Sequence, residues 1–327
     1  MTVAVASLNT AVERLLLVDG HRPGTVHRLA QDQTLAGGKG VNVARVLTRL
    51  AAPKAVSRPC LFGFLGGPTG RLAETLLGEE DLTGLWRDSA EPTRVCEVVV
   101  DREDPEGATV YNARGPRIRP HELRVLDQAV TPLIAEAAVL VCTGSLPPGV
   151  PKDHYARLIT AARRHGTISV LDAHGETLRA GGKAGPDIVK VNRDELLGAG
   201  DGGTDPVTAW LAAGTRCVIV TDGARPARAL TPDGLFEVAA PEVPTRSAVG
   251  SGDAFCAGLV HSLTDRPTAG WQDHLRLAAA CGASNAASVT AGLSSDHHPH
   301  DLMDQVRVTV RKPEPTGRTA FLAPPRP

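Results

Sequence analysis

The segment Ser247-Ala248-Val249-Gly250-Ser251-Gly252-Asp253-Ala254-Phe255 joins a turn of small residues to one carboxylate and runs directly into an apolar, helix-like stretch that ends at Leu263. Small residues let backbone N–H groups crowd around an anion, and the N-terminus of a following helix adds partial positive charge. A bound anion would repel a carboxylate at the rim of such a turn. We therefore expect Asp253 to accept a proton from a nucleophile that attacks the anion. On this segment alone, a plain turn with Asp253 as a helix N-cap is an equal alternative.

The composition of the 327-residue chain is that of an ordinary globular protein, with 42% hydrophobic residues, 22% charged residues and a formal net charge of −1. Such a charge gives no global attraction to nucleic acid or to an anionic membrane, and the 3% of aromatic residues argues against base-stacking surfaces. No apolar run is long enough to span a bilayer, and the segment 1–8 lacks a basic region and is interpreted as a first strand. We expect a cytoplasmic protein with neither nucleic-acid nor membrane partners.

The six cysteines are scattered along the chain and form no C-x-x-C pair. They are Cys60, Cys96, Cys142, Cys217, Cys256 and Cys281. Most lie in apolar runs, so we expect buried free thiols in a reducing compartment and neither disulfides nor a zinc site. The group His297, His298 and His300 is interpreted as part of a solvated loop, because its spacing does not place the side chains on one face.

Short apolar runs alternate with longer helical patterns. The runs expected to form strands are Val3–Leu8, Val139–Cys142, Ile168–Asp172, Ile188–Val191 and Cys217–Thr221. The patterns expected to form helices are Gly40–Leu50, Glu122–Ala137, Asp153–His165, Arg193–Ala199 and Pro206–Ala213. This alternation predicts a mainly parallel sheet covered by helices on both faces, with ligands bound beyond the carboxyl ends of its strands.

A second group of strand-like runs has no helices between its members. These runs are Leu15–Val18, Gly24–Leu29, Thr93–Val100 and Ala108–Asn112. They predict a small β-sheet lid formed by about 12–35 and 91–116, within one domain that covers 1–311. The Pro-rich tail 312–327 has few apolar residues and is expected to be disordered. Gly63–Gly70 is interpreted as a strand end and a turn, because no Lys-Ser or Lys-Thr follows its glycines as in a P-loop.

Three further motifs accompany Gly250–Asp253 in a fixed order: Gly37–Arg45, Thr143–Gly149 and Val189–Leu196. Together they resemble the PfkB branch of the ribokinase-like sugar kinases, and most closely its phosphosugar kinases, a group that includes 1-phosphofructokinases and tagatose-6-phosphate kinases. The resemblance covers roughly residues 3 to 310. It implies a three-layer α/β/α fold with a mainly parallel central sheet and a β lid. It also implies ATP, Mg²⁺ and transfer of the γ-phosphoryl group to a sugar hydroxyl.

The resemblance also implies roles for individual residues. Asp253 matches the catalytic base, and Gly250, Ser251 and Gly252 match the anion hole that stabilises the transferring phosphoryl group. The positions that match nucleotide contacts are Lys190, Asn192, Thr221, Gly223, Gly252 and Asn285. Asn192 and Glu195 match the N-x-x-E motif that holds Mg²⁺ through water, although an ordinary helix start with a solvated Glu195 would look the same.

The residues that match acceptor contacts are Glu13, Gly38, Lys39, Asn42, Arg94 and Ser145. Arg94 lies on a predicted lid strand, and its guanidinium could bind an existing phosphate of the acceptor in a fork. A surface arginine on an edge strand is the simpler alternative. Lys39 would add a second cation, and two cations favour a phosphorylated acceptor over a neutral sugar.

Four positions depart from the family pattern. Glu13 stands where the family has Asp, Ala248 where a Thr is common, Val191 replaces a Pro, and Pro226 removes an N–H near the nucleotide. These departures leave two alternatives open. One is a kinase for an unphosphorylated sugar, a cyclitol or a nucleoside, and the other is a sugar- or nucleotide-binding sensor without catalysis. A homodimer formed through the exposed lid would cover its edge strands.

Overall fold

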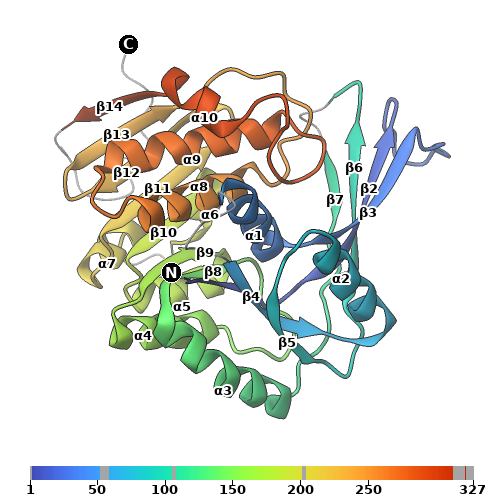
Figure 1. Ribbon diagram of the computed structural model, residues 1–327, viewed down its shortest axis with the longest axis horizontal. Helices are drawn as coiled ribbons and strands as arrows, with labels where there is room; N and C mark the ends of the chain where they lie inside the picture. The colour runs from blue at the N-terminus through green and yellow to red at the C-terminus, as the bar shows by residue number, and fades with distance from the viewer. Residues whose placement is uncertain (1, 52–58, 105–107, 201–203, 312–320, 322–327) are drawn as a thin grey trace.

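The computed structural model describes residues 2–51, 59–104, 108–200, 204–311 and 321. Most of the described chain forms one ten-stranded sheet with helices on both faces (Figure 1). In spatial order the strands are β14 (Arg307–Arg311), β13 (Gly234–Ala239), β12 (Arg225–Thr231), β11 (Cys217–Asp222), β10 (Ile188–Asn192), β9 (Ile168–Asp172), β8 (Ala137–Thr143), β1 (Thr2–Ser7), β4 (Pro59–Leu65) and β5 (Gly84–Asp88). Pairing is parallel from β11 to β5 and antiparallel from β11 to β14.

Side chains of the central strands alternate between two hydrophobic clusters, one on each face of the sheet. On β1, Val3 and Val5 belong to the first cluster, whereas Ala4 and Ala6 belong to the second. The first cluster is covered by α1 (Lys39–Leu50), α2 (Gly67–Glu79), α8 (Ser251–Asp265), α9 (Trp271–Ala286) and α10 (Pro299–Leu302). The second is covered by α3 (Pro120–Glu136), α4 (His154–His165), α5 (Gly175–Lys183), α6 (Arg193–Gly198) and α7 (Pro206–Ala212). This arrangement gives the three layers expected for a parallel sheet that is buried on both faces.

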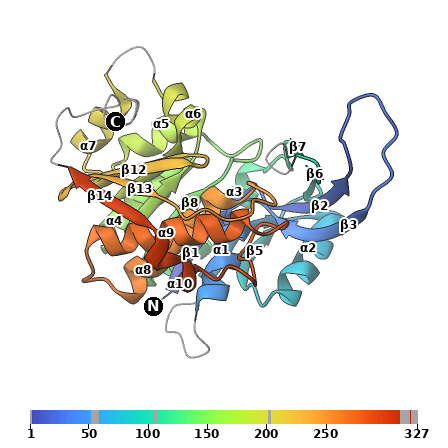
Figure 2. The ribbon, with the colours of Figure 1, turned by 90° about the horizontal axis from the view of Figure 1, so that it is seen from above.

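A separate four-stranded sheet projects from one end of the molecule (Figures 1 and 2). Its strands are β3 (Gln31–Gly37), β2 (Ala11–Val18), β6 (Arg94–Asp101) and β7 (Thr109–Tyr111), in that spatial order. Leu15, Val98 and Val100 form a small buried cluster on one side of this sheet, and Val249 and Val289 pack against them. The small sheet therefore contacts the turn that precedes α8.

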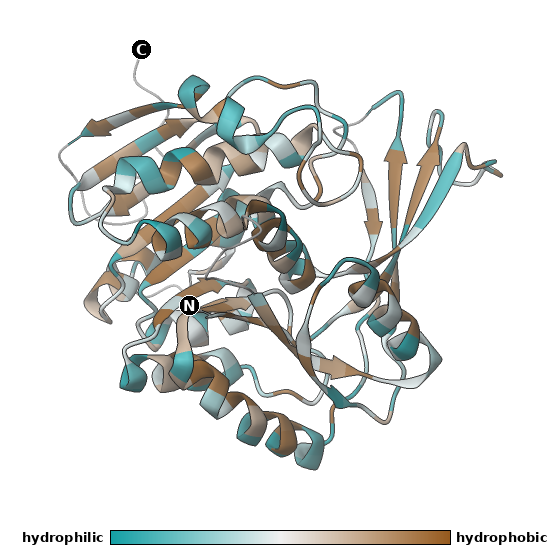
Figure 3. Cartoon of the chain, in the orientation of Figure 1, coloured by the Kyte–Doolittle hydropathy of each residue, from teal (hydrophilic) through white to brown (hydrophobic). Residues whose placement is uncertain are grey.

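The alternating strands and helices predicted from the sequence are confirmed, with bounds that differ by two residues or fewer. One lid strand was predicted in the wrong place. Gly24–Leu29 contains no strand, and the strand of that region is β3, which the sequence analysis missed because its residues from Gln31 to Thr34 are polar and exposed. In Figure 3, β3 is largely hydrophilic while β2 and β6 are hydrophobic. The polar pattern fits an edge strand, since β3 pairs only with β2.

The interpretation of Gly63–Gly70 as a strand end and a turn was also incomplete. β4 ends at Leu65 as expected, but α2 begins at Gly67 and has Pro68 in its first turn. Proline is tolerated there because the first N–H groups of a helix have no partner inside the helix. The pair Gly67-Pro68 therefore starts a helix where the sequence analysis expected a turn.

All six cysteines are free, and five of them are buried. No helix in the described part of the chain is long and apolar enough to cross a membrane. The same residues contain no group of three or more His, Cys, Asp or Glu side chains placed to hold a metal ion. Of the predicted tail, only Phe321 lies within the described residues. It is 4% exposed and packs in the second cluster, so disorder of the tail stays a prediction for the residues around it.

Candidate active site

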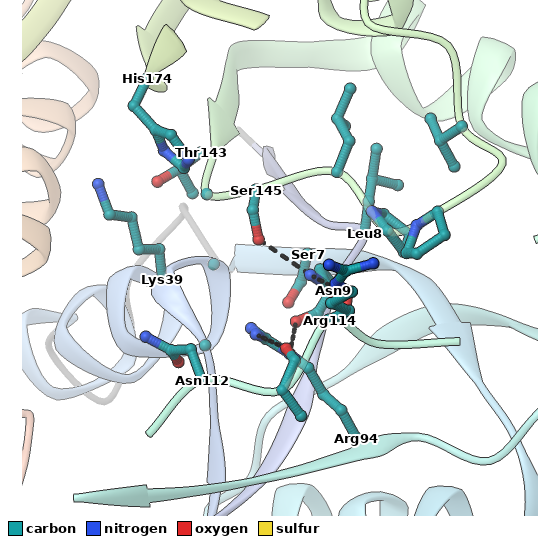
Figure 4. Close-up of a pocket in the computed structure, with 18 of the residues that line it drawn as sticks. Ser7, Leu8, Asn9, Lys39, Arg94, Asn112, Arg114, Thr143, Ser145 and His174 are labelled. Atoms are coloured by element: carbon teal, nitrogen blue, oxygen red, sulfur yellow. Dashed lines mark hydrogen bonds between the residues drawn. The ribbon is translucent and has the colours of Figure 1, made fainter. Parts of the chain in front are cut away.

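A cavity of about 680 Å³ opens beyond the carboxyl ends of β1 and β8, where ligands of open α/β sheets bind (Figure 4). All six residues predicted to contact the acceptor line it: Glu13, Gly38, Lys39, Asn42, Arg94 and Ser145. They come from β2, β6, the start of α1 and the loop after β8. The structure thus gathers residues that are more than 130 positions apart in the chain into one pocket.

The start of α1 brings Lys39 and Asn42 to this cavity. Gly38 is the N-cap and has φ 106°, a value that suits glycine and disfavours a residue with a side chain. Gly40 packs directly on β1, because a Cβ there would lie 2.7 Å from the carbonyl oxygen of Ala6. The glycines of this motif therefore set the approach of α1 to the sheet, which fixes where Lys39 and Asn42 point.

Arg94 reaches the cavity from β6. Its Nε donates to the carbonyl oxygen of Asn9 at 3.0 Å, and its Nη1 donates to that of Ala113 at 2.9 Å. The Asn9 amide in turn donates to Ser145 Oγ at 2.9 Å. Figure 4 shows Arg94 and Arg114 near Asn9, with Lys39 and His174 along the other side of the cavity. Arg94 is thus held by backbone carbonyls and not by a carboxylate.

Glu13 lies on β2, and its side chain lies close to Gly37 of β3, which pairs with Ala11. A Cβ on Gly37 would come within 2.7 Å of Glu13 Cβ and 2.8 Å of its Oε2, so the missing side chain leaves room for the longer carboxylate. Burial raises the pKa of Glu13, and the charges of Arg45 and Arg94 oppose that rise. Glu13 is therefore accommodated at the position where the sequence departs from the family pattern.

Asp253 lies in the first turn of α8 and is 5% exposed. Gly250 is the N-cap, with φ 85°, and offers no side chain to cap the first N–H groups of the helix. Asn42 Nδ2 donates to Asp253 Oδ2 at 2.9 Å, which joins the cavity to this turn. Burial raises the pKa of Asp253 to about 6, against opposing contributions from the charge of Lys39 and the hydrogen bond from Asn42.

Asp172, at the end of β9, lies at the centre of the site, and the sequence analysis did not identify it. Its carboxylate is fully buried and accepts hydrogen bonds from Lys39 Nζ and Lys190 Nζ, each at 2.8 Å. Burial alone would raise the pKa of Asp172, but the charges of Lys190 and Lys39 and their hydrogen bonds hold it at about 2. Asp172 is therefore ionised and fixes both lysines between the cavity and α8.

The predicted nucleotide residues lie farther along the same sheet edge, at the ends of β10 and β11. Lys190 Nζ lies beside the first turn of α8, since a Cβ on Gly252 would come within 2.8 Å of it. Asn285, on α9, is 1% exposed, and its amide donates to the carbonyl oxygen of Val249 and to Ser251 Oγ. Asn285 thus supports the turn predicted to form the anion hole, and its contact with a nucleotide stays a prediction.

The N-x-x-E motif begins α6 as a reciprocal capping box. Asn192 Oδ1 accepts from the Glu195 N–H, and Glu195 Oε2 accepts from the Asn192 N–H, each at 2.8 Å. Glu195 Oε1 lies 3.4 Å from Lys39 Nζ and so faces the centre of the site. Thr221, one residue before the end of β11, pairs with Asn192, and Gly223 with φ 60° lies in the turn to β12. A role of these residues with metal or nucleotide stays a prediction.

Sequence reasoning also missed cavity residues to which it assigned no role. They are Asn9, Asn112, Arg114, Lys152 and His174. Arg114 and Lys152 lie in loops, and nothing in their local sequence distinguishes them from ordinary surface cations. Only their place beyond the carboxyl edge of the sheet identifies them.

Comparison with known proteins agrees with this geometry. The model of the pfkB family carbohydrate kinases matches residues 2–298. The chain belongs to the pfkB family of carbohydrate kinases. The kinase is 33% identical over 273 residues to a 1-phosphofructokinase of Rhodobacter capsulatus, which covers 81% of this chain and 84% of that protein. It is 28% identical over 316 residues to a tagatose-6-phosphate kinase of Staphylococcus epidermidis, and the match covers 94% of this chain and 99% of that protein.

Solved structures support the fold. Phosphofructokinase-2 from Escherichia coli in complex with substrates and products superposes with a TM-score of 0.80 at 24% identity, covering 93% of this chain and 98% of that one. The tetrameric inhibited form of the same enzyme superposes with a TM-score of 0.79 at 24% identity and covers the same shares of the two chains. The ribokinase-like fold with its small separate sheet, expected from the motifs, is thereby confirmed.

Proposed function

We propose that this kinase transfers the γ-phosphoryl group of ATP to a hydroxyl of a hexose phosphate, with fructose 1-phosphate, fructose 6-phosphate and tagatose 6-phosphate as the candidate acceptors. One observation carries the choice of acceptor. Among the described residues that line the cavity, the cations Lys39, Arg94, Arg114 and Lys152 outnumber the single carboxylate, Glu13. Because Lys39 is already paired with Asp172, the remaining cations provide the positive charge that an acceptor phosphate needs.

Asp253 is the proposed base. Its carboxylate takes the proton of the attacking hydroxyl while the sugar oxygen forms a bond to the γ-phosphorus and the bond from that phosphorus to the β–γ bridging oxygen breaks. A pKa raised to about 6 by burial makes Asp253 a stronger base than an ordinary aspartate and leaves it mostly ionised at neutral pH. The N–H groups at the start of α8 face the transferring group, and Lys190 adds charge beside them.

The residues around α8 and α6 fit ATP and Mg²⁺. Gly252 lacks a Cβ where one would crowd Lys190, and this leaves a cradle of backbone and ammonium donors suited to phosphate. Glu195 and Asn192 would hold Mg²⁺ through water, which agrees with the preference of this ion for a few carboxylates and several retained waters. When bound, Mg²⁺ supplies neutralisation of the phosphate charge.

The small sheet is proposed to act as a lid that excludes water from the cavity. Its Arg94 reaches the acceptor, and its apolar cluster already contacts Val249 beside the anion-hole turn. Pairing of two lids in a homodimer would cover Val95, Val110 and Tyr111, which are at least 40% exposed. Six free cysteines agree with a reducing compartment such as the cytoplasm.

An assay of ADP release with Mg-ATP tests the proposal on a panel of acceptors: the three hexose phosphates, free hexoses, a cyclitol and ribonucleosides. We expect strong turnover with one hexose phosphate. Turnover with a neutral acceptor alone would retain Asp253 as the base and remove the phosphate role of Arg94. Nucleotide or sugar binding without product on the whole panel would support the non-catalytic alternative.

A further inference from the structure

Arg45 is a buried arginine on α1 that the proposed mechanism does not use. It is 4% exposed, and each of the five N–H donors of its guanidinium has an acceptor. Nε donates to Glu80 Oε2. Nη1 donates to Asn42 Oδ1 and to the carbonyl oxygen of Ala291. Nη2 donates to Glu80 Oε1 and to the carbonyl oxygen of Ala36. Lysine, with three donors on one nitrogen, could not make this set of bonds.

The ion pair with Glu80 anchors the guanidinium. Glu80 is the C-cap residue of α2, and its two oxygens accept from Arg45 Nε and Nη2 in a fork. The Arg45 side chain is therefore fixed in the plane of that carboxylate, and its Nη1 points along α1 toward Asn42. Residues three positions apart on a helix share a face, so the backbone already brings Asn42 and Arg45 together.

Arg45 determines which way the Asn42 amide points. A guanidinium only donates hydrogen bonds, so the atom of Asn42 that faces it at 2.9 Å has to be the carbonyl oxygen Oδ1. The NH₂ group of Asn42 then faces Asp253 and donates to its Oδ2 at 2.9 Å. With the opposite orientation, an amide oxygen would face the carboxylate and an NH₂ group would face the guanidinium, and both contacts would be repulsive.

A second branch from Arg45 reaches the anion-hole turn. Its Nη1 also donates to the carbonyl oxygen of Ala291 at 3.3 Å, and the N–H of the next residue, Gly292, donates to Asn285 Oδ1 at 2.8 Å. The Asn285 amide donates to the carbonyl oxygen of Val249, one residue before Gly250. The same guanidinium therefore supports the proposed base through one amide and the proposed anion hole through another.

We propose that Arg45 is a positioning residue for phosphoryl transfer, which acts by holding the Asn42 amide in the orientation that donates a hydrogen bond to Asp253. The proposal rests on the proposed function, because it takes Asp253 as the base. With one carboxylate oxygen occupied by Asn42, the other is left to receive the proton of the acceptor hydroxyl. Arg45 touches neither carboxylate oxygen of Asp253, so its effect on the proton affinity of Asp253 passes through Asn42.

The charged groups that face Asp253 are Lys39 from α1, Asp172 from β9 and Lys190 from β10. Asn42 adds a hydrogen bond that lowers the pKa of Asp253. A variant in which the amide is free to turn loses that contribution while the three charges stay in place. The pKa of Asp253 should then rise by about one unit, which is a tenfold increase in its affinity for the proton.

The test variant is Arg45→Met combined with Glu80→Met, because removal of Arg45 alone would leave Glu80 without its partner. Replacing both members of a buried pair by apolar residues preserves folding far better than removing one. The matched control is Arg49→Met. Arg49 lies one turn further along α1 and donates to the carbonyl oxygen of Leu293, in the same loop as Ala291, but it does not contact Asn42.

Two measurements separate this proposal from the proposed function. The first is the ¹³C NMR titration of the Asp253 carboxyl in the resting enzyme, assigned by its loss in Asp253→Asn, and it requires no turnover. We expect its midpoint to rise by about one unit in the double variant and to stay unchanged in Arg49→Met. The second is the pH profile of kcat/KM for the acceptor, whose acid limb should move by the same amount while kcat falls about tenfold or more and KM for ATP changes little.

A double variant that retains its folded thermal transition but shows the wild-type Asp253 titration would overturn the proposal. A fall in kcat at an unchanged acid limb would also overturn it, because it would mean that Arg45 only supports the fold. If wild type shows no kinase activity on any acceptor, the proposed function fails. The NMR titration would still decide whether Arg45 controls the Asn42 amide.

Discussion

Replacing Asp172 with asparagine removes one negative charge from the centre of the site and keeps the shape of the side chain. The Asp172 carboxylate is fully buried, and Lys39 Nζ and Lys190 Nζ each donate to it at 2.8 Å. Despite burial, the two lysines hold its pKa at about 2, below the usual 3.8. A lowered carboxylate pKa means that ionised Asp172 stabilises the folded state at every pH above 3.8. This stabilisation is lost as the pH falls from 3.8 towards 2.

The size of the effect follows from this pKa. A pKa lowered by roughly two units corresponds to roughly 2–3 kcal/mol at about 1.36 kcal/mol per unit. Breaking a buried ion pair by removing one partner costs about 3–5 kcal/mol, because the other charge stays buried. We therefore expect Asp172→Asn to lower the free energy of unfolding by about 2–5 kcal/mol, a large part of the roughly 5–15 kcal/mol of a typical domain.

Urea denaturation at pH 7 measures this loss, with Asp19→Asn as the control. Asp19 also pairs with an arginine, Arg102, but its side chain is 55% exposed, so solvent screens the pair and the unfolding midpoint should not change. A loss of stability in Asp172→Asn no larger than that of the control would refute the reasoning.

The Asp172→Asn variant should also move the acid limb of any remaining activity to lower pH, because the charge of Asp172 raises the pKa of Asp253. A limb that moves to higher pH would contradict the arrangement of charges.

Three further predictions concern the acceptor and the base. Asp253→Asn should fold normally, as judged by circular dichroism, and lose about 10²–10⁴ in kcat, whereas a near-wild-type kcat would exclude it as the base. Wild-type kcat/KM for the acceptor should fall as the pH drops below about 6, because the raised pKa of Asp253 leaves the base protonated there; an acid limb near 4 would show an unperturbed carboxylate. Arg94→Ala should raise KM for a phosphorylated acceptor by about 10- to 100-fold, the value of a charge-assisted hydrogen bond, and leave KM for ATP nearly unchanged; equal increases would remove Arg94 from the acceptor site.

The sequence predicted the layered core because its signals are local. The alternation of Val3 and Val5 with Ala4 and Ala6 is visible in a few residues, and it places side chains on two faces wherever the strand lies in the sheet. The cavity residues Gly38, Lys39, Asn42 and Ser145 were predictable for a different reason, since they belong to short motifs with a characteristic order. Where neither periodicity nor a motif was present, as in the polar edge strand β3, the prediction was wrong.

Asp172 and Arg45 could not be identified from local patterns. Asp172 ends an apolar strand like many others, and only the parallel pairing of β9 with β8 and β10 brings it between Lys39 and Lys190. Arg45 is the last residue of the motif Gly37–Arg45, which suggested no role for it. Its partner Glu80 lies 35 residues away at the end of a helix that the sequence analysis did not predict. Both residues acquire their partners only when separate segments of the chain pack together.

Asp172 and the Asn42 amide, which we propose Arg45 to hold, act on the pKa of Asp253 with opposite sign, and this balance would let a buried carboxylate serve as the proposed base at neutral pH. Burial and the charge of Asp172 raise the pKa of Asp253, while Lys39, the Asn42 amide and Lys190 lower it. Without the raising contributions Asp253 would be a weak base, and without the lowering ones it would be protonated and inactive. Asp172 affects the pKa of Asp253 in both directions. Its negative charge raises that pKa directly, and it also holds in place Lys39 and Lys190, whose positive charges lower it. The proton affinity of Asp253 therefore depends on the packing of α1, β9 and β10 around α8 more than on the glycine-rich turn that first marked it in the sequence.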